Sequence, residues 1–206
     1  MQEIARPCAP RSGLVRARVL VAGFVLAAAG KVYFAEGDAR QAEEHWRRAV
    51  ELVPYSLDPW MMLAWAFEQQ GRNDDALGVL TDLAKANPES PVVYLRLGER
   101  AVGFQRFEVA EQAFRDAIRV APRIAAGYVA LARFYLQTGR NVAAATTLAR
   151  QAVDLEPSAP NYCLLASAFL ASGDRATALV AIDRAVAQDP NNAYYRELRE
   201  SILRGS

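Results

Sequence analysis

The sequence contains few of the residue types from which catalytic and metal sites are built. It has one histidine, His45, and two cysteines, Cys8 and Cys163, which lie far apart and form no CxxC motif. A lone histidine without a second ligand three or four residues away does not indicate a metal site. With Glu44 and Arg48 as near neighbours, His45 is expected on a solvated helix face. No glycine-rich phosphate loop or Ser-His-Asp set can be recognised, so we expect no catalytic residue, no metal and no cofactor.

The sequence also lacks an excess of charge of either sign. It has 24 Lys and Arg residues against 23 Asp and Glu residues, which gives a net charge of +1. A protein that binds nucleic acid mainly by neutralising phosphates needs a basic surplus, so no nucleic-acid partner is expected. Two widely separated cysteines do not indicate a disulfide framework, and they leave the cellular compartment open.

A strong internal repeat is present instead. Similar phrases such as "RRAVELVP" and "TDLAKANP" each end in a proline, and these prolines are 34, 34, 35 and 33 residues apart. They are Pro54, Pro88, Pro122, Pro157 and Pro190. Because proline cannot continue a helix, each one indicates a helix end. A glycine beside a polar residue, as in "EGDA" and "TGRN", favours a tight turn near the middle of most periods. Each period therefore predicts two antiparallel helices.

Apolar and small residues recur at helical spacing within each period. The first helix of every period carries a small residue at one shared position, namely Gly30, Ala64, Gly98, Ala132 and Ala166. An aromatic residue follows three positions later in four periods, as Tyr33, Phe67, Tyr135 and Phe169. Small residues let two helix backbones approach, and aromatic side chains fill the space beside them. Stacking of neighbouring pairs is expected to stabilise the array.

This pattern resembles the tetratricopeptide repeat (TPR) family. The family's W-x2-L-G-x2-Y motif corresponds here to "WMMLAWAF", "YLRLGERA", "YVALARFY" and "YCLLASAF". The resemblance implies an all-α, right-handed TPR superhelix, an alpha-alpha solenoid of five helix pairs. The five repeats are predicted over residues 19–190, with bounds 19–56, 57–90, 91–124, 125–158 and 159–190. The third repeat departs from the family pattern at Ala101, where an aromatic is usual, and at Gln105, where glycine is usual.

The two ends of the chain are expected to differ from the repeats. Residues 1–18 are predicted to be a basic N-terminal segment that is flexible or bound to a partner. Residues 191–206 are predicted to form a capping helix and tail, with Asn191 or Asn192 as the N-cap. A terminal cap with a polar outer face keeps a repeat array soluble. The side chains expected to face inward are Tyr195, Leu198, Ile202 and Leu203.

The resemblance also implies a concave groove, lined by the first helix of each repeat, that binds proteins or peptides. Met61, Met62 and Trp65 would form an adaptable apolar platform for an apolar peptide or an amphipathic helix. The alternative is that these side chains belong to the core between repeats. Our hypothesis is that Trp65 is a binding hot spot. The predicted groove residues are Phe34, Met61, Met62, Trp65, Glu68, Leu95, Glu99, Arg133 and Leu136.

The stretch "VLVAGFVLAAAGKVYFAEGD", residues 19–38, leaves three interpretations open. It is the first helix of repeat one, an uncleaved membrane anchor over residues 19–35, or a cleaved secretion signal. Four residues that fit the repeat positions favour the first, namely Leu26, Gly30, Tyr33 and Gly37.

As a repeat helix, this stretch is apolar on all sides, whereas an ordinary first helix is amphipathic. An N-terminal apolar face then needs a cover, which could be residues 1–18, another subunit, a partner protein or lipid. The residues of this face are Val19, Val21, Phe24 and Val25.

The sequence thus predicts a non-catalytic scaffold or adaptor that binds a protein or peptide partner in an apolar groove, within a larger complex. Membrane contact through the N-terminal segment and self-association are further possible interactions. The alternative function is a membrane-anchored assembly factor, similar to bacterial TPR proteins of cytochrome or envelope biogenesis. The predicted location is the cytoplasm, with a membrane-associated or periplasmic location as the alternative.

Overall fold

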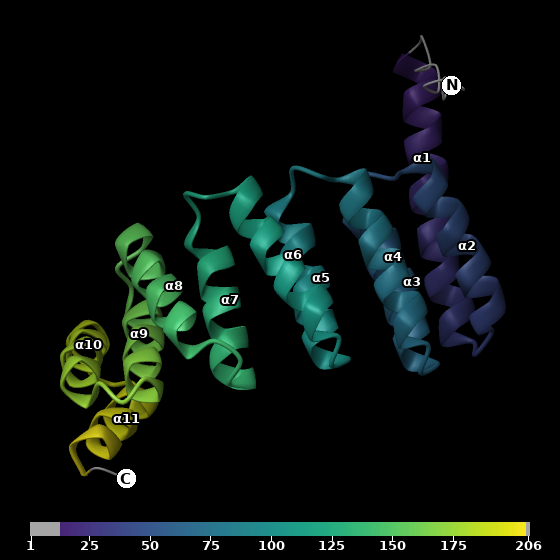
Figure 1. Cartoon of the computed structure of the whole chain (residues 1–206). Coiled ribbons are helices and arrows are strands. Elements are labelled where there is room, and N and C mark those ends of the chain that lie inside the picture. The colour runs from purple at the N-terminus through teal and green to yellow at the C-terminus, as the bar shows by residue number, and fades with distance from the viewer. Residues whose placement is uncertain (1–12, 205–206) are drawn as a thin grey trace, which may run out of the picture. The chain divides into compact units, whose positions relative to one another are not determined.

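The computed structural model describes residues 13–204, with side chains from Ala17 onward, and this part of the chain contains α-helices and no strands (Figure 1). The all-α class predicted from the sequence is confirmed. The helices belong to two compact units, Met1–Pro88 and Glu89–Ser206. The first unit contains α1 (Gly13–Ala35), α2 (Ala39–Leu52), α3 (Leu57–Gln69) and α4 (Asn73–Ala86). The second unit contains α5 (Pro91–Gly103), α6 (Phe107–Val120), α7 (Ala125–Thr138), α8 (Val142–Leu155), α9 (Ala159–Ala171), α10 (Arg175–Gln188) and α11 (Ala193–Arg204).

The turn inside each helix pair passes through a residue with a left-handed backbone. Four of these residues are the glycines of the sequence pattern, Gly37, Gly71, Gly139 and Gly173. In the third pair Gln105 takes the same conformation, with φ 58°. This region costs a residue with a Cβ about 1–2 kcal/mol, and glycine adopts it freely. The departure at Gln105 therefore keeps the turn at a cost in strain.

The core of the first unit is built around Trp46 of α2, whose side chain is fully buried against α1. Its indole Nε1 donates a hydrogen bond of 3.1 Å to the carbonyl oxygen of Ala27. A Cβ added to Gly30 would lie 2.5 Å from that same nitrogen. The small residue at this position therefore makes room for the tryptophan, as the sequence pattern predicted.

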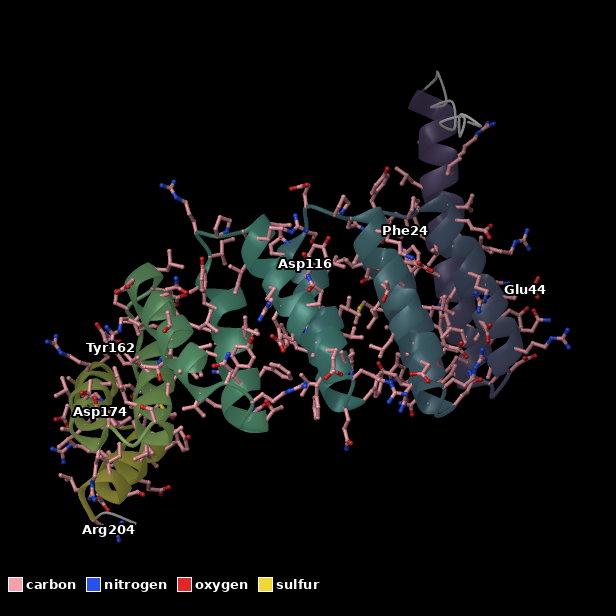
Figure 2. The ribbon with its side chains drawn as sticks, in the orientation of Figure 1. Phe24, Glu44, Asp116, Tyr162, Asp174 and Arg204 are labelled. Atoms are coloured by element: carbon pink, nitrogen blue, oxygen red, sulfur yellow. The ribbon has the colours of Figure 1, made fainter. Side chains whose placement is uncertain are left out.

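Helix α1 is longer than the other first helices and begins at Gly13. Residues 13–18, which the sequence assigned to the N-terminal segment, are thus part of the helix, and no proline between Pro10 and Pro54 interrupts it. The rest of the predicted segment, residues 1–12, lies outside the described residues. A Cβ on Gly23 would lie 2.7 Å from Val53, just past the end of α2, so the turns before Gly23 extend beyond α2 (Figure 1). Phe24, labelled in Figure 2, is more than half exposed.

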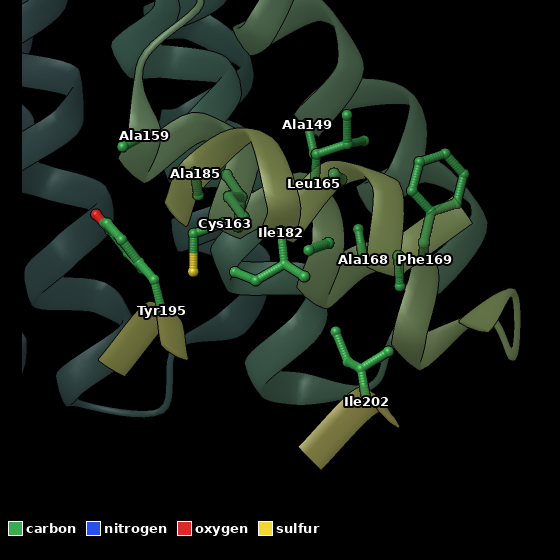
Figure 3. Close-up of a cluster of buried hydrophobic side chains, with 14 of the residues drawn as sticks. Ala149, Ala159, Cys163, Leu165, Ala168, Phe169, Ile182, Ala185, Tyr195 and Ile202 are labelled. Atoms are coloured by element: carbon green, nitrogen blue, oxygen red, sulfur yellow. The ribbon is translucent and has the colours of Figure 1, made fainter. Parts of the chain in front are cut away.

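Helix α11 closes the core at the C-terminal end of the second unit. Tyr195 and Ile202 are buried in a cluster that includes Cys163 of α9 and Ile182 of α10 (Figure 3). The N-cap of α11 is Asn192, whose Oδ1 accepts a hydrogen bond of 3.4 Å from the Tyr195 backbone N–H. Leu198 packs against the cluster as expected.

The inward orientation predicted for Leu203 is wrong, since this side chain is exposed. A helix turns about 100° per residue, so a residue next to the buried Ile202 lies well off the buried stripe.

Candidate partner-binding groove

The second unit contains a groove of about 390 Å³ between α5 and α7, the first helices of two successive repeats, which contact each other directly. Its walls are mainly apolar, and its size is enough for a few side chains of a ligand. The lining residues are Leu95, Glu99 and Val102 of α5, Phe114 of α6, and Ala126, Val129, Ala130, Arg133, Phe134 and Gln137 of α7.

The floor of the groove is an aromatic cluster in the core of the unit. The ring of Phe134, which is almost fully buried, lies 6.0 Å from the ring of Phe114 and 6.1 Å from that of Phe107. Tilted aromatic pairs at such distances are favourable beyond simple burial. A Cβ on Gly98 would lie 2.4 Å from Phe114, so the small residue of α5 is what lets this ring reach the groove.

Two charged positions lie on the apolar walls. Glu99 is already paired, because its Oε2 lies 3.1 Å from Nη1 of Arg96. Arg133 is exposed and forms no ion pair or hydrogen bond with any residue that the structure describes. Arg133 lies near Cys163 of α9, the first helix of the next repeat. Burial raises the pKa of the Cys163 thiol, and the positive charge of Arg133 opposes that rise. The groove therefore offers apolar surface together with one guanidinium that is free to bind an acceptor.

Of the groove residues predicted from the sequence, the structure brings Leu95, Glu99 and Arg133 together in this groove. Leu136 is partly buried against the core cluster of the unit and does not line the groove. Val102 and Val129 also line the groove; both occupy helix positions that the repeat pattern turns inward, although the predicted set did not include them. The floor residues were missed because Phe134 occupies a first-helix position that holds alanine in α3 and α9.

The remaining predicted groove residues belong to the first unit and gather around Trp65 on α3. The ring of Phe34 lies 4.6 Å from the ring of Trp65, and Met61 and Met62 on α3 are partly exposed. Trp65 is 37% exposed, whereas Trp46 and Trp60 are buried and donate their indole N–H groups to backbone carbonyls. Glu68 is also partly exposed on α3. Trp65 thus packs on Phe34 of the preceding repeat and still exposes part of its ring, so both the groove interpretation and the core alternative stay open.

The N-terminal apolar face is largely exposed. Val21 and Val25 are each 61% exposed, Phe24 and Leu20 about half, and Val19 less. The segment Ala17–Ala35 has a mean hydropathy of 1.6 and is long and apolar enough, by length and composition, to cross a membrane. Only 17% of this segment is buried, and the buried residues lie on the side that packs on α2.

The neighbours of His45 are a backbone carbonyl and an aromatic ring. Its Nδ1 lies 2.9 Å from the carbonyl oxygen of Gln41, and its ring centroid lies 4.8 Å from that of Tyr33 in a tilted arrangement. Across residues 13–204, no three or more His, Cys, Asp or Glu side chains are grouped so that they could hold a metal ion.

Comparison with known proteins identifies the family. Two models of the tetratricopeptide repeat match residues 33–97 and 95–160, which together are more than half of the chain. The chain belongs to the tetratricopeptide repeat family. TPR proteins mediate protein–protein interactions, occur as subunits of complexes and are typically non-catalytic.

Among curated proteins, this TPR protein is 32% identical to Anaphase-promoting complex subunit 3 of Schizosaccharomyces pombe over 92 residues. It is 30% identical to Protein O-mannosyl-transferase Tmtc1 of Drosophila melanogaster over 107 residues. These matches cover 45% and 50% of this chain but only 14% and 12% of those proteins. The chain therefore spans a small part of the curated relatives that it matches.

Solved structures agree with the repeat architecture. A thermophilic TPR protein of Thermus thermophilus is 25% identical, with a TM-score of 0.59 over 88% of this chain and 99% of that one. The MamA protein matches with a TM-score of 0.64 at 19% identity, over 84% and 95% of the two chains. YrrB, described as a TPR protein with an unusual peptide-binding site, matches at 0.62 and 12% identity over 85% and 90%. The resemblance to a TPR solenoid found in the sequence is confirmed.

Proposed function

We propose that this TPR protein is a non-catalytic scaffold that holds a segment of a partner protein in the groove between α5 and α7, within a larger complex. The observation that carries the proposal is Arg133, an unpaired guanidinium on the wall of an apolar groove in the described structure. Among the proteins of similar fold, YrrB is a TPR protein with a peptide-binding site.

The chemistry of the groove defines the segment that would fit it. Leu95, Val102 and Val129 offer apolar contacts over the buried Phe134 floor, so the segment should carry one or two apolar side chains. Arg133 needs an acceptor, and a carboxylate can take two parallel hydrogen bonds from a guanidinium. A segment with an Asp or Glu next to Leu, Ile, Met or Phe meets both demands.

Selection from a random peptide library displayed on phage, against the immobilised full chain, tests this proposal. We expect the enriched peptides to combine an acidic residue with a neighbouring apolar one. Substitution Arg133→Glu should weaken their binding at least about tenfold, because the charge pair is replaced by repulsion. Arg184→Glu, an exposed arginine on α10 outside the groove, is the matched control and should leave affinity unchanged. Peptides that bind the wild type and Arg133→Glu equally would overturn the proposal.

The surface around Trp65 is a second place at which the partner would make contact, and we retain the hypothesis that Trp65 is a hot spot. Trp46 and Trp60 are buried already, so a change in tryptophan emission on partner binding should come from Trp65. We expect a blue shift with the wild-type chain and none with Trp65→Phe, at equal thermal stability. Tyr55→Phe, an exposed aromatic on the turn before α3, serves as the control. A shift that persists in Trp65→Phe would exclude this surface.

The alternative function, a membrane-anchored assembly factor with residues 19–35 as the anchor, is less favoured by the packing of α1. Helix α2 lies along α1 from about Gly23 to Ala35, and α2 carries exposed charges such as Glu44 and Arg48. A spanning α1 would place these charges in hydrocarbon, or would separate α2 from the helix on which Trp46 packs. The cytoplasmic location expected from the sequence stays a prediction, as do its membrane-associated and periplasmic alternatives.

A further inference from the structure

One side of α1 carries an exposed stripe with the spacing of a coiled-coil seam. The stripe residues are separated by three and four positions in alternation, which is the a and d pattern of a heptad. They are Arg18, Val21, Val25, Ala28, Val32 and Ala35, all of them exposed. Val21 and Val25 are each 61% exposed and Val32 is 55% exposed. Gly23 and Gly30, which face α2, lie on the opposite side of the helix.

In repeats two to five, the first helix uses the same side to pack against another helix. The residues that correspond to Val25 in α3, α5, α7 and α9 are all buried, and so are three of the four that correspond to Val32. The first group is Pro59, Val93, Gly127 and Asn161, and the buried members of the second are Ala66, Phe134 and Ala168. Within the units, α3 packs on the preceding α2, α7 on α6 and α9 on α8. This side of a first helix is thus shaped to receive another helix.

We propose that the helix received by this stripe is α1 of a second copy of the chain, packed antiparallel about a two-fold axis. An antiparallel arrangement centred between Val25 and Ala28 makes the stripe complementary to itself. Val25 then meets the small Ala28 of the partner subunit, and Val21 meets Val32 of the partner subunit. A two-fold interface of this kind is closed and uses the same surface on both copies.

The charges at the two ends of the stripe support this arrangement over its alternatives. Arg18 at one end comes next to Glu36 of the partner subunit, and the symmetry repeats this pair at the other end. Arg18 and Glu36 are exposed, and neither forms an ion pair with any residue that the structure describes. An anionic lipid surface would attract Arg18 and repel Glu36, so it uses only half of this charge pattern. The seam and the groove belong to different units and share no residue.

The mass of the full chain in detergent-free buffer, measured by light scattering after gel filtration, is the first test. We expect twice the 22.6 kDa of one chain. Val25→Glu should give the monomer without loss of helicity or thermal stability, because the side chain is exposed and does not pack on α2. Val180→Glu on α10, where the valine is also 61% exposed, is the matched control and should remain dimeric. A wild-type monomer, or a dimer that Val25→Glu leaves intact, would overturn the proposal.

Exchanging the charges of Arg18 and Glu36 distinguishes a second copy of the chain from lipid as the occupant of the stripe. Arg18→Glu and Glu36→Arg should each raise the dimer dissociation constant about tenfold, and the double variant should restore it, because the exchanged pair attracts again. Sedimentation with vesicles of equal parts phosphatidylcholine and phosphatidylglycerol provides the other arm. Pelleting of a monomeric chain that is lost in Val25→Glu and enhanced in Glu36→Arg would assign the stripe to lipid. Failure of the double variant to restore the dimer would also contradict the two-fold arrangement.

Discussion

Gly30 is the residue on which the packing of the first helix pair depends most closely. An added Cβ would lie 2.5 Å from Nε1 of Trp46, which is buried and hydrogen-bonded to the Ala27 carbonyl. We expect Gly30→Ala to lower the free energy of unfolding by about 1–3 kcal/mol, because the tryptophan has to move in a packed core. Denaturation by urea, followed by circular dichroism, measures this change.

Gly78 supplies the matched control for Gly30. It also lies inside a helix, but a Cβ added there would meet no atom within 4 Å. Gly78→Ala should therefore raise stability by about 0.5–1 kcal/mol, since alanine loses less backbone entropy in a helix. Equal effects of the two substitutions would show that the contact with Trp46 does not control packing.

Single residues also mark the limits of what the sequence could predict. The small-residue position was predictable because Gly30 and Gly98 share it with alanines in the other repeats, and its role is confirmed. Arg133 could be placed on an inward position by the same counting. Its lack of a partner among the described residues could not be predicted, because that depends on which side chains of α5 and α9 come within reach.

At the scale of one element, α10 begins with an aspartate N-cap that makes its stability depend on pH. The Asp174 carboxylate accepts a hydrogen bond of 3.0 Å from the Thr177 backbone N–H (Figure 2). Hydrogen bonding by Thr177 lowers the pKa of Asp174 below its ordinary value of 3.8. A lowered pKa means that the ionised cap stabilises the folded state above about pH 3.8, and that this stabilisation is lost as pH falls through the folded-state pKa.

The substitution Asp174→Asn tests this cap, because asparagine caps a helix about as well but does not titrate. We expect the wild type to lose stability relative to Asp174→Asn as the pH falls below about 4. Urea unfolding at several pH values measures the difference. The control is Asp154→Asn on α8, an exposed aspartate that does not cap a helix. An unchanged difference between wild type and Asp174→Asn over this range would refute the role of the carboxylate.

The elements themselves were largely predictable, except at the ends of the array. Repeated prolines and turn glycines mark the ends of the helix pairs, and Gln105 keeps its turn although it lacks the glycine signal. The start of α1 was not predictable from the repeat pattern. That pattern describes only residues that pack on α2, and residues 13–22 extend beyond it. Leu203 was assigned to the core by apolarity alone, and its angular position on α11 decided otherwise.

At the scale of the whole molecule, the family resemblance implied a concave groove lined by the first helix of each repeat. The described structure contains two compact units, and each has a candidate surface. Leu95, Glu99 and Arg133 share a groove in the second unit, whereas Phe34 and Trp65 pair in the first. Repeat periodicity predicts which side of each helix faces inward, but it does not predict how deep the groove between two helices is. Here the depth of the groove depends on Phe134, a residue that is not part of the repeat pattern.

Methyl NMR of the full chain with one library-selected peptide tests the central claim most directly, because it reports which side chains a ligand touches. We predict that the methyl signals of Leu95, Val102 and Val129 shift on titration. Those of Val180 and Leu155, exposed on second helices, should stay in place. The shifts should disappear in Arg133→Glu at the same peptide concentration. Saturable shifts that leave all three groove residues unchanged would contradict the assignment of partner binding to the groove between α5 and α7.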